Sequence, residues 1–121
     1  MDFSVLLEEI RQADTITIFR HVSPDCDAVG SQFALKNWIE ENFAGKHVYA
    51  CGNEVTHQAE WPDNDKVSDE IIASSIAIVL DTANKQRVDD ERFAQALKVI
   101  KVDHHPDREP FGDICLINDS A

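Results

Sequence analysis

Three short apolar runs in this chain each lead directly into acidic or imidazole side chains. The clusters that follow residues 15–19, 76–80 and 97–102 are, respectively, His21 with Asp25 and Asp27, then Asp81, then Asp103-His104-His105. Apolar runs without strict alternation predict strands of a parallel sheet buried on both faces, and right-handed crossovers through helices keep such strands parallel. The carboxyl ends of parallel strands share one edge, where ligands bind in open α/β sheets. The three clusters are therefore predicted to meet at one edge.

The remaining patterns complete an α/β prediction. Apolar residues at helical spacing predict a helix over residues 3–12, and further helices are predicted at 28–43, at 68–74 and from residue 89. Strands are predicted at residues 15–19, 47–50, 76–80, 97–102 and 114–117, with polar loops at 51–66, 82–87 and 106–112. The fold class that follows is a doubly wound, mainly parallel sheet with helices on both faces.

Charge and composition exclude several classes of function. The net charge is -12, with 23 acidic against 11 basic residues, which argues against a broad basic face for extended duplex nucleic acid. No apolar stretch approaches the ~20 residues that cross a bilayer, and the N-terminus lacks a signal-peptide pattern. Three separated cysteines without a CxxC pair fit a reducing compartment. We therefore predict a cytoplasmic protein without membrane contact. The sequence leaves its oligomeric state open, a homodimer included.

The clusters have the composition of a divalent-cation site. An aspartate before a helix is commonly only an N-cap, so the first cluster alone is ambiguous. Three clusters at one edge favour metal binding, because carboxylates and imidazole suit hard or borderline cations. Asp81 follows the middle of the three apolar runs in chain order, and it is the expected bridge between two ions. His21 and Asp25 would hold one ion, and Asp27 and His104 the other, with a shared water attacking phosphorus in line.

Other residues near this edge are candidates for supporting roles. Asp103 is expected to orient an imidazole, since metal-bound histidines usually donate their second N–H to an acceptor. His105 is expected to contact a substrate phosphate. The cationic residues in loops near the edge could neutralise that phosphate, with simple solvation as the alternative for each; they are Arg20, Lys85, Arg87 and Arg108. His57 is better explained as a lone surface histidine.

Together, the motifs His21-x-x-x-Asp25-x-Asp27-x-x-Gly30-Ser31, Asp81-Thr82-Ala83-Asn84 and Asp103-His104-His105-Pro106 resemble the first three motifs of the DHH phosphoesterase family. The similarity is greatest to its RecJ-like nanoRNase/pAp-phosphatase branch. The resemblance implies that two Mn²⁺ ions are bound, although Mg²⁺ and other divalent cations suit the same side chains. It assigns the metal ligands His21, Asp25, Asp27, Asp81 and His104, with His105 on the substrate phosphate and Asp103 in support.

The resemblance implies a hydrolase that cleaves short oligoribonucleotides and 3′-phosphoadenosine 5′-phosphate. It also implies that residues 1–121 are the N-terminal part of a DHH domain, without the fourth acidic motif and the glycine-rich substrate domain, and inactive in isolation. Manganese inorganic pyrophosphatase and cyclic-dinucleotide phosphodiesterase share these motifs and stay open as alternatives. The non-enzymatic alternatives are a folded fragment without catalysis and a flavodoxin-like binding domain.

Overall fold

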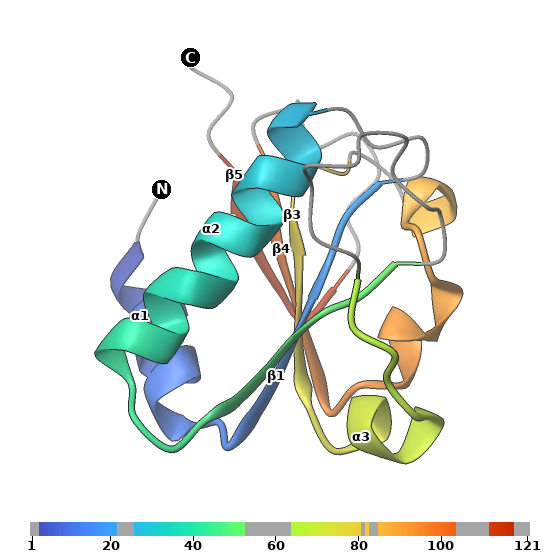
Figure 1. The fold of residues 1–121 in the computed structure, drawn as a ribbon. Helices are drawn as coiled ribbons and strands as arrows, with labels where there is room; N and C mark the ends of the chain where they lie inside the picture. The colour runs from blue at the N-terminus through green and yellow to red at the C-terminus, as the bar shows by residue number, and fades with distance from the viewer. Residues whose placement is uncertain are drawn as a thin grey trace.

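The computed structural model describes residues 3–21, 26–52, 64–80, 82, 85–103 and 112–117. The helices and strands in this part of the chain are α1 (Phe3–Gln12), β1 (Thr15–Phe19), α2 (Cys26–Asn42), β2 (His47–Ala50), α3 (Asp69–Ala73), β3 (Ile76–Leu80), the 3₁₀ turns η1 (Lys85–Arg87) and η2 (Glu91–Gln95), β4 (Lys98–Asp103) and β5 (Ile114–Ile117). Figure 1 shows the strands side by side between two helical layers.

The described strands pair in the order β2-β1-β3-β4-β5, and each of their four pairings is parallel. The chain therefore passes from β1 to β2 on one side and returns to β3 on the other. In open α/β sheets this change of direction leaves a crevice outside the carboxyl ends of the two central strands. Here those strands are β1 and β3, which pair from Ile16 with Ile76 to Phe19 with Val79.

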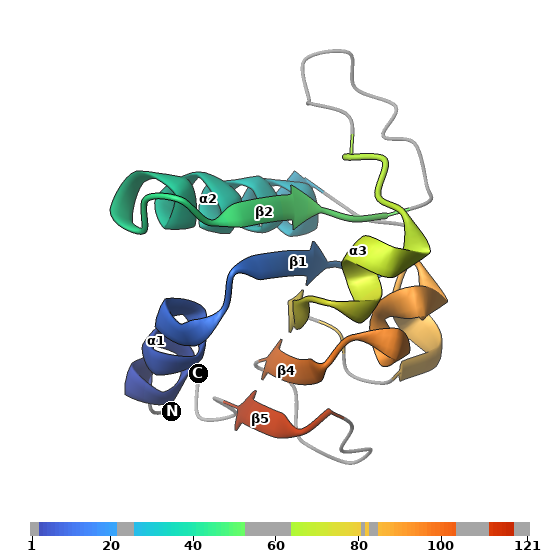
Figure 2. The same cartoon turned by 90° about the horizontal axis from the view of Figure 1, so that it is seen from below.

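Alternate strand residues supply two separate cores, one on each face of the sheet. On one face, Ile18 and Ile78 pack in the same cluster as Ile10 of α1 and Ile39 of α2. On the other face, side chains from β1, β3 and β4 pack with Ile72 of α3 and with η2. Figure 2, seen from below, likewise places α1 and α2 away from α3 and the orange segment of residues 85–95. The predicted doubly wound α/β architecture is thus confirmed.

Most predicted element boundaries agree with the structure, and the differences have local causes. The helix predicted from residue 89 is the 3₁₀ turn η2, capped by the Asp90 side chain on Arg92 N and ended at Ala96. Because β4 begins at Lys98, too few residues remain for a longer helix. The polar loop predicted at 82–87 includes η1. Helix α2 ends at Asn42, and Gly45 then takes a φ of 84°, which suits glycine at the turn into β2.

Across the described ranges, each helix is too short or too polar to traverse a bilayer.

Candidate functional site at the carboxyl edge of the sheet

The parallel register brings the ends of the central strands to one end of the sheet. Phe19 of β1 pairs with Val79 of β3, and Leu80 of β3 pairs with Val102 of β4. Helix α2 begins at the same end, at the top of Figure 1. The backbones of His21, Asp27 and Asp103 lie there, respectively two residues beyond β1, in the first turn of α2, and at the last residue of β4.

Several predicted site residues fall outside the described part of the chain, namely Asp25, Asp81, His104, His105 and Arg108. Among the five predicted metal ligands, His21 alone has a described side chain, and it is half-buried. Within the described side chains, no group of three or more histidine, cysteine, aspartate or glutamate residues gathers to hold a metal ion. The metal site therefore stays a prediction. Its imidazole and carboxylate donors fit Mn²⁺ or Mg²⁺.

The position of His21 is fixed by a second segment that reaches it from β3. His21 forms an antiparallel bridge with Val88, and the Asp89 N–H donates to the Arg20 carbonyl at 2.7 Å. That carbonyl belongs to the peptide group that joins Arg20 to His21. The residues just after η1 thus hold the backbone on the N-terminal side of the predicted metal ligand.

Arg20 lies in a different environment from the solvated loop position that the sequence suggested. Its side chain is 1% exposed, and its Nε atom lies 3.4 Å from Asp89 Oδ2, whose side chain is 3% exposed. Direct contact with a substrate phosphate requires an accessible guanidinium, so the expectation of an exposed Arg20 is corrected: the arginine faces a buried carboxylate. Arg87, at the end of η1, is exposed as the sequence suggested.

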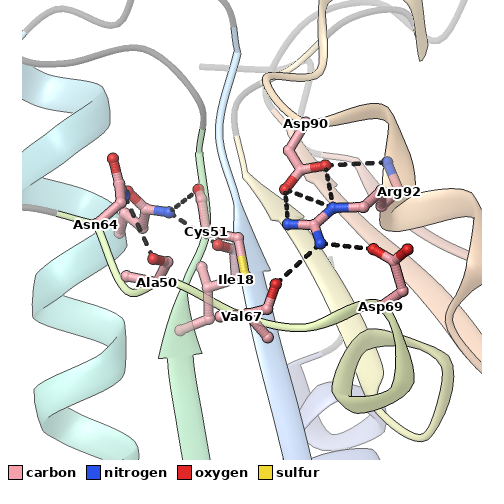
Figure 3. Close-up of polar contacts among 9 residues, drawn as sticks. Ile18, Ala50, Cys51, Asn64, Val67, Asp69, Asp90 and Arg92 are labelled. Carbon is pink, nitrogen blue, oxygen red and sulfur yellow. Dashed lines mark hydrogen bonds and ion pairs between the residues drawn. The ribbon is translucent and has the colours of Figure 1, made fainter.

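A buried amide joins α2 to the ends of β1 and β2. Gln32, 0% exposed, donates through Nε2 to the Ile18 carbonyl at 2.8 Å and to the Cys51 carbonyl at 2.7 Å. Its Oε1 accepts from Asn64 Nδ2 at 3.2 Å, and Asn64 also reaches the Ala50 carbonyl at 3.4 Å. Figure 3 shows Asn64, Ala50, Cys51 and Ile18 converging at this point. The N-terminal half of α2 is thereby held against the carboxyl edge.

Arg92 forms a second polar junction, on the other side of the sheet (Figure 3). Its guanidinium donates to both carboxylate oxygens of Asp90, with the shortest contact from Nη2 at 2.8 Å. Its Nη1 atom donates to Asp69 at 2.7 Å and to the Val67 carbonyl at 2.9 Å. The hydrogen bond to Asp90 is the main cause that raises the Arg92 pKa, and the bond to Asp69 adds to it. This junction fastens η2 to α3 and to the segment before it.

Cys51 is a buried thiol between these two junctions. Burial raises its pKa to about 12, and the nearby Asp90 carboxylate adds to the effect. A thiol held neutral is a poor nucleophile and a poor metal ligand. Cys51 is therefore a packing residue at neutral pH.

Sequence reasoning missed the buried polar residues at this edge. Gln32 resembles any polar position on a helix, and Asp89 resembles a helix-opening acid. Lys101, 0% exposed, lies within a run that was interpreted by its apolar residues. The available signal was weak: a lysine inside a strand otherwise buried on both faces needs a partner or a special environment.

The fold identifies the class of protein: it is a parallel α/β domain. The backbones of two residues predicted to bind a metal, His21 and Asp27, lie at the carboxyl edge of its central strands. The family model for the DHH family, N-terminal domain, matches residues 15–120. The chain belongs to this family.

Curated relatives and a solved structure agree with this assignment. The chain is 40% identical over 119 residues to a Streptococcus mutans protein named probable bifunctional oligoribonuclease and PAP phosphatase NrnA, covering 98% of this chain and 38% of that protein. It is 38% identical to the Bacillus subtilis protein of corresponding name, covering 96% and 37%. The structure of an exopolyphosphatase-related protein from Bacteroides fragilis superposes with a TM-score of 0.80 at 26% identity, covering 97% of this chain and 38% of that one. The chain thus spans little more than a third of the length of these relatives.

Proposed function

We propose that this chain supplies the metal-binding part of a phosphoesterase that hydrolyses short oligoribonucleotides and 3′-phosphoadenosine 5′-phosphate. The observation that carries the proposal is the parallel register of β1, β3 and β4, whose carboxyl ends precede the three motifs. Membership of the DHH family and relatives named as oligoribonuclease and phosphatase support the substrate class.

The proposed ligand set for two divalent cations, Mn²⁺ by preference, is His21, Asp25, Asp27, Asp81 and His104. When bound, such a pair of cations lowers the pKa of a bridging water and offsets the negative charge on phosphorus oxygens. Asp81 would contribute to both metal positions. Asp103 would hold an imidazole in its ligating tautomer by accepting the N–H that does not face the metal.

Substrate binding is proposed for the cationic and imidazole groups around this edge. His105, Arg87 and Arg108 would donate to phosphate oxygens, and the exposed position of Arg87 is compatible with that role. Arg20 is left out of the direct contacts because its guanidinium is buried against Asp89. A chain with a net charge of -12 needs such local positive charge to admit an anionic substrate.

The test is Asp81→Ala in the full-length protein, assayed for Mn²⁺-dependent hydrolysis of a short RNA and of 3′-phosphoadenosine 5′-phosphate. We expect turnover to fall by at least about 100-fold, because loss of a bridging ligand affects both cations. Asp14→Ala is the matched control, since Asp14 is an exposed aspartate just before β1, at the opposite end of the sheet.

Unchanged turnover in Asp81→Ala would refute the bridging role. A substrate panel that includes pyrophosphate and a cyclic dinucleotide tests the substrate class. Preferential hydrolysis of either compound would replace the proposed activity by the corresponding alternative.

A further inference from the structure

Three segments that are far apart in the sequence converge beside His21. Arg20 follows β1, Gly52 follows β2, and Asp89 follows the Val88 bridge. Arg20 and Asp89 form a buried ion pair, and the Asp89 N–H also binds the carbonyl of the Arg20–His21 peptide. The pair therefore fixes the same chain segment through both a side-chain contact and a backbone contact.

Gly52 provides the space that this ion pair occupies. A Cβ atom at Gly52 would lie 2.9 Å from Arg20 Nε, 2.9 Å from Asp89 Oδ2 and 3.0 Å from Arg20 Nη2. Contacts this short force the side chains to move. The glycine is needed here for room beside the two charged groups, since a larger residue would push one or both of them out of this arrangement.

Stability alone does not explain why the Arg20–Asp89 ion pair is buried. Removing two charges from water costs about as much as their attraction returns, so a buried ion pair is weak support for stability by itself. It does impose a definite arrangement, because each charge strongly disfavours any position in which it loses the other. In this fold the arrangement fixes the peptide that precedes a predicted metal ligand.

We propose that Arg20, Asp89 and Gly52 form a positioning unit that sets the orientation of His21 for metal binding. The inference rests on the proposed function, because His21 is a ligand only there. In this proposal Arg20 acts by orienting His21 and does not contact the substrate directly. It also links the segment after β3 to the end of β1, so that a shift in residues 88–89 is transmitted to the metal site.

The experiment measures Mn²⁺ binding to the full-length protein by calorimetry, with steady-state kinetics in parallel. Gly52→Ala is expected to weaken Mn²⁺ binding by about 10- to 100-fold, the range typical of groups that orient a metal ligand. The value of kcat should fall at limiting Mn²⁺, while KM for the nucleotide stays within about twofold. Asp89→Asn retains the side-chain shape and the backbone donor but leaves the buried Arg20 without its carboxylate partner, so it should weaken Mn²⁺ binding at least as much. Arg20→Lys, which retains the positive charge, serves if Gly52→Ala does not fold.

Gly45→Ala is the matched control. Gly45 has open space around it but a φ of 84°, so alanine strains the backbone far from the carboxyl edge. It should lower the unfolding midpoint and leave Mn²⁺ affinity unchanged. If Gly52→Ala and Asp89→Asn also retain wild-type Mn²⁺ affinity, the unit is merely structural and the proposal is overturned.

Arg20→Lys separates positioning from substrate contact. A raised KM with unchanged Mn²⁺ affinity would show that Arg20 binds substrate and would overturn the inference. A wild-type protein that neither binds Mn²⁺ nor hydrolyses either substrate would overturn the proposed function and this inference with it. Wild-type binding together with unaffected variants would overturn the positioning role alone.

Discussion

Replacing Gln32 by leucine should destabilise the fold by about 2–3 kcal/mol. The side chain is fully buried and makes two short hydrogen bonds to backbone carbonyls, at 2.8 and 2.7 Å, and a longer one to Asn64 at 3.2 Å. A typical hydrogen bond contributes a net ~0.5–1.5 kcal/mol, and the two short ones make most of the total. Leucine is close in volume, so little cavity forms. Both backbone carbonyls lose this donor, and within the described part of the chain only the Ile18 carbonyl keeps another, the Cys51 N–H at 2.9 Å.

The measurement is urea unfolding of the full-length protein, followed by circular dichroism. For the usual dependence of stability on urea, ~1–3 kcal/mol per M, the midpoint should fall by about 1–2 M. Gln95→Leu is the control, because Gln95 is exposed on η2 and surface changes usually stay within about 0.5 kcal/mol. A Gln32→Leu midpoint equal to that of the control would refute the view that this amide ties α2 to β1 and β2.

Two further predictions concern the other face of the sheet. Arg92→Leu should lower the free energy of unfolding in urea by about 3–5 kcal/mol, because Asp90 then remains buried without its ion-pair partner. A decrease of less than about 1 kcal/mol would contradict this role. Cys51 should resist iodoacetamide at pH 8 while the partly exposed Cys115 reacts, as read by peptide mass spectrometry, because burial keeps the Cys51 pKa near 12. Since this pKa is raised above its ordinary value of 9.0, the contribution of the Cys51 thiol to stability should be constant below pH 9 and be lost from about pH 9 to pH 12. Equal alkylation of both thiols in the folded protein would contradict the prediction.

The strands were the most predictable part of the fold. Four of the five were expected with the observed boundaries, and β4 is displaced by one residue, from 97–102 to Lys98–Asp103. Short runs of branched apolar residues, each bounded by polar residues, leave few alternatives when both faces of a sheet are covered. The segment from residue 89 was less predictable because acids at a helix start do not reveal how many residues follow before the next strand.

At the candidate site, motif spacing and strand direction were predictable, while the contacts around His21 were not. Neither Gly52 nor Asp89 carries a local signal that connects it to Arg20. Their meeting depends on how β1, β2 and the segment after β3 are placed next to one another. A glycine needed for space rather than for a positive φ is indistinguishable in sequence from one at an ordinary strand end.

The sequence by itself determined the order of helices and strands, the direction of the strands and the residue types at their carboxyl ends. The order and the residue types are local properties, because apolar periodicity and turn residues act over a few positions, while the strand direction follows from the helices that connect successive strands. Only the tertiary structure decided that β1 lies between β2 and β3, that Arg20 is buried against Asp89, and that Gln32 joins three segments. Those contacts join residues 14 to 69 positions apart, and packing alone chooses among the many pairings that such separations allow.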